Sequence, residues 1–351
     1  MTSHTNEGQR LLLMGCGGVG GVLAGGLLRG GRDLTIVTRN EEICRALDAD
    51  GLRLITPEGE WSVPATVYTH LDEIEGGFDA VYLAMKGTDV EQAVRDVESH
   101  LTPEGYVVTF QNGVVEDRVS AILGRERVIG ALVGWGATMH APGVSEMTSH
   151  GEIIVGELDG RLTPRVQRLK ATLESIGPVT ASTNIYGQLW SKLTLNCATS
   201  ASGAVTGQLL GEMLVRNAGR RLALAIMSEV VDVAEAHGIS LEPVGGTLDV
   251  HRLYLPPERR GGGWGLDLVF RHAIMMVVGA KFRRLKSSML QSIERGRPAE
   301  IDFLNGYVAE RGREKGVPTP VNAALATMVR EIEAGTRAIS PDNLEELLAP
   351  L

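Results

Sequence analysis

The first half of the chain alternates short apolar, β-branched runs with longer stretches in which apolar residues recur at helical spacing. Strands are predicted at residues 10–14, 34–38, 80–85, 106–110 and 128–133. This alternation is typical of βαβ units, which build a mostly parallel sheet. Two later runs, residues 143–147 and 152–156, predict a hairpin that closes the sheet edge. We therefore predict an α/β domain with a doubly wound parallel sheet over residues 1–183.

After that domain the pattern becomes helical throughout. Helices are predicted at residues 185–199, 211–237, 266–285, 299–315 and 321–334. Residues 239–265 contain several glycine and proline pairs and are predicted to form a long mobile loop. An all-helical C-terminal domain is therefore expected over residues 184–351.

The formal net charge of -9 narrows the class of partner. Nucleic acids are bound by basic faces, and none dominates this sequence, so we expect a small-molecule partner and no nucleic acid. The most apolar later stretch, residues 266–280, is interrupted by Asp267, Arg271 and His272. Because it is shorter than the roughly 20 residues of a membrane helix, it predicts a core helix and no membrane partner.

The three cysteines, Cys16, Cys44 and Cys197, are too few and too scattered for a disulfide framework. They have no histidine neighbours at zinc-binding spacing, so no metal site is expected. Residues 1–10 are polar and show no export signal. These features favour a reducing, cytoplasmic location.

A glycine-rich turn follows the first predicted strand. The pattern G-x-G-x-x-G is matched by Gly15, Cys16, Gly17, Gly18, Val19 and Gly20. The first glycine permits the tight turn, the second lets a pyrophosphate approach the backbone, and the third lets the helix pack closely. The helix N-terminus then faces the phosphates. Because strand, turn and helix occur in this order, we interpret the segment as the dinucleotide site of a Rossmann-like domain.

The end of the second predicted strand distinguishes the two nicotinamide cofactors. It reads Thr38-Arg39-Asn40, where NAD enzymes usually carry an acid for the ribose hydroxyls. An arginine pairs with a 2′-phosphate that a carboxylate would repel, so NADP(H) is predicted. The alternative is a solvated Arg39 with Glu41 or Glu42 as the ribose acid.

Lys86 and Asn112 follow two further predicted strands. Ligands of doubly wound sheets bind beyond the carboxyl ends of the strands, so both are candidate cofactor-binding residues. Each is equally compatible with an ordinary turn, since Asn112-Gly113 is a common turn pair.

The first helix of the C-terminal half carries a polar stripe. Gln188, Lys192, Asn196 and Ser200 recur every four residues on a helix that is otherwise apolar. A lysine among leucine and tryptophan side chains should be partly desolvated, which lowers its pKa toward the range useful for a general acid. The other interpretation is a lysine that buries only its stem and extends its ammonium group into water.

These residues together resemble the landmarks of the ketopantoate reductase (2-dehydropantoate 2-reductase) family, and the resemblance covers nearly the whole chain. In chain order, the motifs are the glycine motif with Arg39, Lys86, Gln111-Asn112-Gly113, His150-Gly151-Glu152, Lys192-Leu193-x-x-Asn196, Ser287-Ser288-Met289-Leu290-Gln291 and Glu300-Ile301-Asp302-Phe303-x-Asn305-Gly306. Each motif is short, and their combination is specific.

The resemblance implies NADPH-dependent reduction of a 2-oxo acid to a 2-hydroxy acid, of the ketopantoate-to-pantoate type in pantothenate biosynthesis. It implies that Lys192 protonates the carbonyl oxygen, that Asn196 orients the substrate and that Glu300 binds a substrate hydroxyl. Ser288 would hold the substrate carboxylate, with Ser200 as a further substrate-binding residue. Without the resemblance, Ser288 is a polar helix residue and Glu300 an acid favoured by the helix dipole.

Three positions depart from the family pattern, which has further asparagines where this sequence has Ser200, Leu210 and Leu285. Part of a polar substrate cage is therefore absent, and another carbonyl or alcohol substrate remains an alternative to ketopantoate. The basic run at residues 283–286 either supplies positive potential or forms a solvated helix face.

A different class of protein would sense NADP(H) without catalysis. A sensor has no need of a partly buried Lys192, so catalysis is the favoured interpretation. The apolar residues Met275, Met276, Val277 and Val278 are compatible with a homodimer interface or with an intramolecular core.

Overall fold

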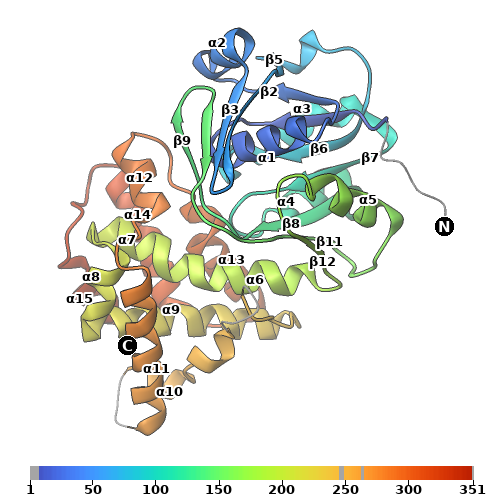
Figure 1. Cartoon of the computed structure of the whole chain (residues 1–351). Coiled ribbons are helices and arrows are strands. Elements are labelled where there is room, and N and C mark those ends of the chain that lie inside the picture. The colour runs from blue at the N-terminus through green and yellow to red at the C-terminus, as the bar shows by residue number, and fades with distance from the viewer. Residues whose placement is uncertain (1–7, 245–248, 262–264, 350–351) are drawn as a thin grey trace. The chain divides into compact units, whose positions relative to one another are not determined.

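The computed structural model describes residues 8–244, 249–261 and 265–349. It divides into two units, and Figure 1 shows the elements of both. The first unit consists of Met1–Gln111 and Val115–Ile185, and the second of Asn112–Val114 and Tyr186–Leu351. Within the described ranges, no helix combines the length and the apolar character needed to cross a membrane.

The first unit is built on an eight-stranded sheet with the order β12-β11-β8-β7-β6-β1-β2-β5 (Figure 1). The strands are β1 (Leu11–Met14), β2 (Leu34–Val37), β5 (Thr66–Tyr68), β6 (Phe78–Leu83), β7 (Leu101–Thr109), β8 (Val128–Val133), β11 (Ile153–Glu157) and β12 (Val179–Ala181). Neighbouring strands are parallel, except that β8 and β11 are antiparallel. The predicted Rossmann-like sheet is confirmed, because continuous apolar runs form strands that are buried on both faces.

A second, four-stranded sheet has the order β4-β3-β10-β9. It consists of β3 (Leu52–Thr56), β4 (Gly59–Val63), β9 (Ala137–Ala141) and β10 (Val144–Met147). The predicted hairpin between residues 143–147 and 152–156 is wrong. β10 turns back on β9 through Gly143, whose φ of +75° favours a tight turn, and it also pairs with β3. β11 pairs instead with β8 and β12 in the main sheet.

Helices cover both faces of the main sheet. They are α1 (Gly18–Arg29), α2 (Glu41–Asp50), α3 (Val90–Val97), α4 (Glu116–Leu123) and α5 (Pro164–Leu173). The apolar faces of α1 and α5 share one core with the main sheet, and the leucines of β3 join this core from the second sheet. On α1, a Cβ added to Gly25 would lie 2.9 Å from the Leu54 side chain, so this glycine allows the close approach of helix and sheet.

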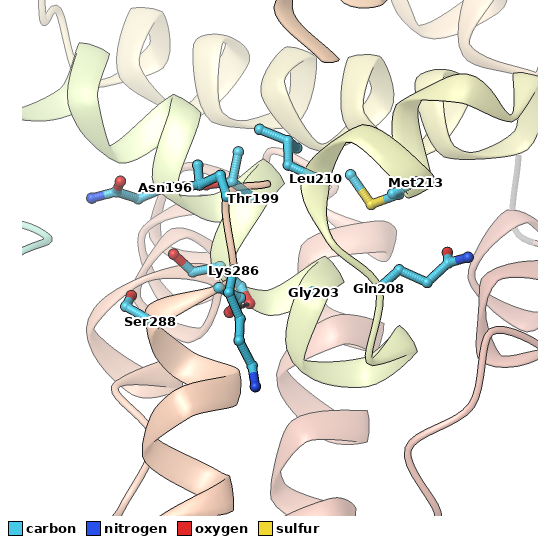
Figure 2. A pocket seen from close by; sticks show the side chains of 11 residues that line it. Asn196, Thr199, Gly203, Gln208, Leu210, Met213, Lys286 and Ser288 are labelled. Atoms are coloured by element: carbon cyan, nitrogen blue, oxygen red, sulfur yellow. Dashed lines mark hydrogen bonds between the residues drawn. The ribbon is translucent and has the colours of Figure 1, made fainter. Parts of the chain in front are cut away.

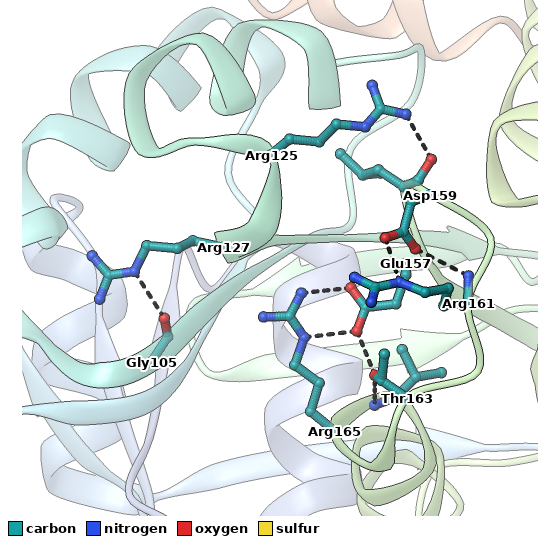
Figure 3. A network of polar contacts seen from close by, with 10 residues as sticks. Gly105, Arg125, Arg127, Glu157, Asp159, Arg161, Thr163 and Arg165 are labelled. Atoms are coloured by element: carbon teal, nitrogen blue, oxygen red, sulfur yellow. Dashed lines mark hydrogen bonds and ion pairs between the residues drawn. The ribbon is translucent and has the colours of Figure 1, made fainter.

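A buried carboxylate ties the end of β11 to the start of α5 (Figure 3). Glu157 is 4% exposed, and it accepts hydrogen bonds from the Thr163 hydroxyl and from Arg165 Nε at 2.7 Å. Nearby, Arg125 and Arg127 donate to the backbone carbonyls of Leu158 and Gly105. This network stabilises one end of the sheet, and it contains none of the predicted site residues.

The second unit is helical. Its elements are α6 (Ile185–Asn196), the π-helix η5 (Cys197–Ala201), α7 (Ser202–Thr206), α8 (Leu210–Val215), α9 (Asn217–Ala236), η6 (Val250–Leu253), α10 (Pro257–Arg260), α11 (Leu266–Lys281), α12 (Ser288–Glu294), η7 (Ile301–Phe303), α13 (Asn305–Lys315), α14 (Pro320–Glu333) and α15 (Asn343–Leu348). The central helix is α9, which packs against α8, α11, α13, α14 and α15. The predicted all-helical domain is therefore confirmed.

Three predictions for this unit need correction. The helix predicted at residues 211–237 is two helices, because Arg216 between them is extended. The loop predicted at residues 239–265 contains η6 and α10, and its residues 245–248 and 262–264 lie outside the described ranges. The helix α11 is not a core helix, since only Leu268, Met275 and Gly279 of its residues are buried.

Candidate functional site

The glycine turn has the shape of a dinucleotide cradle. Gly15 has a φ of +91°, and an added Cβ there would lie 2.6 Å from Met85 N. A Cβ on Gly20 would lie 2.0 Å from Gly15 O, so the third glycine is required by the packing of α1. A Cβ on Gly17 would meet nothing within 4 Å. Gly17 is also the N-cap of α1 and supplies no side-chain cap, so the helix N-terminus borders open space that suits a pyrophosphate.

The other residues of the glycine turn differ in which of their atoms a ligand could contact. The Cys16 side chain is 3% exposed, and burial raises the pKa of its thiol to about 12. Cys16 therefore offers only its backbone to a ligand. Gly18 and Val19 form the first turn of α1, and Val19 packs on the core of the first unit.

Arg39 lies directly after β2 with an exposed guanidinium group. Its Nη2 pairs with Asp96 Oδ2 of α3 at 3.1 Å. The neighbouring Asn40 is the N-cap of α2, where its Oδ1 accepts from Glu42 N and Ile43 N at 2.9 and 3.0 Å. Glu42 is exposed in the first turn of that helix, so an arginine and a carboxylate both lie near this strand end.

Lys86 follows β6 and is the N-cap of the short helix η2 (Gly87–Asp89). The strand end beside it is held by Gln111, whose Nε2 donates to Leu83 O at 3.0 Å and to Met85 O at 3.2 Å. Lys86 therefore lies at a fixed strand end in the same unit as the glycine turn.

Asn112 follows a strand of the first unit, but it belongs to the second unit. Asn196 lies in the same unit, and its Nδ2 is 3.5 Å from Asn112 Oδ1. The next residue, Gly113, has a φ of +92°, and an added Cβ would lie 2.3 Å from Phe303 O. This close approach places the Asn112 turn against η7, whose N-cap is Glu300. Three predicted site residues are thus brought to one region of the second unit.

Lys192 lies on α6, one helical turn before Asn196. Its neighbours Leu189, Trp190 and Leu193 are at most 2% exposed. Burial lowers the pKa of the Lys192 ammonium group to about 8. A lysine with this pKa is largely protonated at neutral pH and releases its proton more readily than an exposed lysine does.

The helix changes its hydrogen-bond pattern directly after Asn196. Residues Cys197–Ala201 form a π-helix, a feature that is frequent at functional sites and that disturbs the regular carbonyl pairing. Two of its carbonyls accept from side chains that are distant in sequence. Asn305 Nδ2 donates to Cys197 O at 3.2 Å, and Ser287 Oγ donates to Ser200 O at 2.6 Å.

A pocket of about 160 Å³ lies at this π-helix (Figure 2). Three predicted substrate-binding residues, Asn196, Ser200 and Ser288, line it, whereas Glu300 and Lys192 do not. Five further lining residues were not predicted from the sequence, and they are Thr199, Gly203, Gln208, Met213 and Ser287. Leu210 and Leu285, two of the positions that depart from the family pattern, also line it.

Close backbone packing builds the walls of this pocket. A Cβ on Gly203 would lie 2.6 Å from Ser287 Cβ, and a Cβ on Gly211 would lie 2.6 Å from Arg283 Cα. Leu210 N also donates to Leu285 O at 3.0 Å. The segment before α12 is therefore held against the starts of α7 and α8.

The basic run before α12 is exposed to solvent. Lys286 lines the pocket with its stem, but its ammonium group points away from the other labelled side chains in Figure 2. That group pairs with Glu294 at 2.6 Å. The run is therefore solvated, but it is not the helix face of the alternative interpretation, because α11 ends at Lys281 and α12 begins at Ser288.

Comparison with known proteins identifies the family. A family model described as ketopantoate reductase PanE/ApbA matches residues 11–160, and the model of the C-terminal part of the same family matches residues 184–333. The chain belongs to the ketopantoate reductase family. Family membership makes it an oxidoreductase that acts on CH–OH groups and the corresponding carbonyls.

Relatives of this ketopantoate reductase family member span its length. It is 30% identical to a 2-dehydropantoate 2-reductase from Mesorhizobium japonicum, over 92% of this chain and 97% of the relative. A PanE/ApbA family ketopantoate reductase from Ralstonia eutropha JMP134 superposes with a TM-score of 0.79 at 28% identity, covering 93% and 99% of the two chains. A D-mandelate dehydrogenase with NADH and anilino(oxo)acetate has the same fold, with a TM-score of 0.78 at 19% identity and the same coverage.

Proposed function

We propose that this family member reduces a 2-oxo acid to the 2-hydroxy acid with NADPH, and that Lys192 is the general acid. The observation that carries the proposal is the lowered pKa of Lys192, one turn before an asparagine that lines a pocket with hydroxyl donors. A general acid works best when its pKa lies near the operating pH. A protein that only senses a nucleotide has no use for such a group.

Residues 1–183 are proposed to bind the cofactor and residues 184–351 the substrate. The open space at Gly17 and the uncapped start of α1 fit a pyrophosphate. The exposed Arg39 guanidinium fits a 2′-phosphate, which would replace Asp96 as its partner. Lys86 would add positive charge, and Asn112, which contacts Asn196, is proposed to bind the cofactor beside the substrate residues.

A cofactor held by the glycine turn and Arg39 would supply the hydride for the carbonyl carbon. Lys192 donates a proton from Nζ to the carbonyl oxygen and becomes a neutral amine, which solvent reprotonates. Asn196 orients the carbonyl group through its amide, and the hydroxyls of Ser288 and Ser200 hold the carboxylate. Glu300 accepts a hydrogen bond from the hydroxyl of the 2-hydroxy acid.

The test is NADPH oxidation by the purified protein with a panel of 2-oxo acids that includes ketopantoate. We expect turnover of at least one 2-oxo acid, with NADPH preferred to NADH. Failure to reduce any acid in the panel would contradict the reaction class. If another acid exceeds ketopantoate, the reaction class stands and the ketopantoate assignment falls.

We also propose that the protein forms a homodimer through α11. Five large apolar residues of this helix are exposed, namely Leu266, Val269, Phe270, Met276 and Val277. Contiguous apolar surface of this kind is unusual on a monomer, and twofold symmetric pairs are the commonest oligomers. Sedimentation of the wild type and of Val277→Asp tests this: a wild type that sediments as a monomer at micromolar concentration contradicts the dimer.

A further inference from the structure

We infer that the substrate of this pocket is a 2-oxo acid whose side chain is apolar, and that Leu210 and Leu285 select it. The inference rests on the proposed function, because it names the class of 2-oxo acid that the same site takes. It depends on how the polar and apolar atoms of the pocket are distributed.

Much of the hydrogen-bonding capacity near the pocket is already used. The Thr199 hydroxyl donates to Leu195 O at 3.0 Å, and the Ser287 hydroxyl donates to Ser200 O at 2.6 Å. The ammonium group of Lys286 points away from the other labelled side chains in Figure 2 and pairs with Glu294. The amide of Gln208 also points away from them, and its Oε1 is buried without a hydrogen-bond partner among the described residues. Ser200, Ser288 and the second amide hydrogen of Asn196, whose Nδ2 also contacts Asn112, remain as donors, one for each oxygen of a carboxylate and a carbonyl group.

The remaining wall is apolar. Leu210 and Met213 are 7% and 2% exposed, and Leu285 completes this side of the pocket. The apolar surface continues beyond the pocket, because Thr199, Leu210 and Met213 also line a neighbouring apolar cavity of about 30 Å³. A substrate hydroxyl placed against this wall would lose its water without gaining a partner.

The volume fits this class of substrate. The pocket holds about 160 Å³. An apolar cavity of about 150 Å³ is large enough to bind benzene. The pocket can therefore take a branched alkyl group beside the 2-oxo acid head.

The experiment compares two 2-oxo acids that differ at one group. Ketopantoate carries a hydroxymethyl group, and 3,3-dimethyl-2-oxopentanoate has a methyl group in place of that hydroxyl. We expect the wild type to prefer the methyl compound by about 10-fold to 100-fold in kcat/KM, the range for a hydroxyl buried without a partner. Equal values, or a preference for ketopantoate, would overturn the inference.

Two variants test the residues that select the side chain. Leu285→Asn changes a side chain that is 48% exposed, so the fold should tolerate it, and Leu210→Asn changes a buried wall residue. At least one should move the ratio toward ketopantoate by about 10-fold, mainly through KM, since an amide can pair with the hydroxyl. Leu162→Asn, at a residue that is 52% exposed in the first unit, is the control and should leave the ratio unchanged. If both folded variants keep the wild-type ratio, Leu210 and Leu285 do not select the substrate.

A separate measurement distinguishes this inference from the proposed function. If neither acid is reduced, the proposed reaction is contradicted. Calorimetric binding of the same two acids to the wild type then still tests the pocket. Tighter binding of the methyl compound supports an apolar site, and tighter binding of ketopantoate contradicts it.

Discussion

Asn305 Nδ2 donates a hydrogen bond to the carbonyl oxygen of Cys197 at 3.2 Å, although the two residues are 108 positions apart. The same nitrogen donates to Asn322 Oδ1 at 2.9 Å, and the amide of Asn322 in turn donates to the buried Glu229. This chain of contacts ends at the π-helix that carries Ser200. A carbonyl that is displaced from regular helical pairing thus finds a donor on a separate helix.

Asn305→Ala should therefore destabilise the protein by about 2–4 kcal/mol, because it leaves buried polar groups without partners. Urea unfolding measures this change. Asn305→Asp has nearly the same size but no donor, and it should be at least as harmful. The exposed Asn217→Ala is the control, with little expected change. A stable Asn305→Asp would show that the contact with Cys197 O is unimportant.

The pKa of Lys192 predicts the pH dependence of the reduction. The protonated amine is the acid, and its pKa is about 8. We expect kcat/KM for reduction to be level below pH 8 and to fall about tenfold per pH unit above it. In Lys192→Arg the guanidinium stays protonated, so the residual activity should lose this alkaline fall.

Replacing Lys192 by alanine should lower kcat by about 10²-fold to 10⁴-fold, the usual contribution of a general acid. Binding of NADPH should change little, because Lys192 is assigned to the substrate carbonyl. The control is Lys170→Ala, which removes a lysine paired with Glu174 on α5 in the first unit. Full activity of Lys192→Ala would remove Lys192 from the mechanism.

Arg39 and Asp96 form a matched test of cofactor preference. Arg39→Ala should raise the KM for NADPH about 10-fold to 100-fold and leave that for NADH nearly unchanged, since only NADPH has the 2′-phosphate. Asp96→Asn removes the competing carboxylate, so NADPH should bind a few-fold more tightly. If Arg39→Ala changes the KM of both cofactors equally, Arg39 does not bind the 2′-phosphate. The alternative, in which Glu41 or Glu42 binds the ribose hydroxyls, is then favoured.

Two glycines of the turn should respond differently to the same substitution. A Cβ on Gly17 meets no atom within 4 Å, so Gly17→Ala should keep the thermal midpoint of the wild type. It should nevertheless weaken dinucleotide binding about tenfold or more, because the methyl group occupies the space assigned to the pyrophosphate. Gly20→Ala should lower the thermal midpoint, since its Cβ would lie 2.0 Å from Gly15 O. Unchanged dinucleotide binding in Gly17→Ala would move the phosphates away from this turn.

The parts of the fold that the sequence predicts are those determined by local pattern. Buried strands of the main sheet are continuous apolar runs, and the glycine turn has fixed spacing. The strands β3 and β4 were missed because they are short and half exposed, and residues such as Glu60 and Ser62 in β4 resemble a loop. The wrong hairpin has a different origin: both strands were recognised, but their pairing depends on turns and on partners distant in sequence.

In the candidate site, too, only the features determined by local sequence pattern could be predicted. The spacing of Lys192 and Asn196 was visible in the sequence, because helical periodicity places them on one face. The π-helix was not, since its apolar pattern does not differ visibly from that of the α-helix before it. Met213 and Gln208 carry no motif, and they reach the pocket only because Gly203 and Gly211 allow distant backbone segments to pack closely.

The assignment of Asn112–Val114 to the helical unit has a practical consequence for protein engineering. The polypeptide enters that unit and leaves it again before α6 begins, so the two units are not separable by a single cut. In a chimera joined once at Ile185, residues 112–114 would come from one parent and η7 and Asn196, which they contact, from the other. Recombination within the family should therefore transfer Asn112–Val114 together with the helical half.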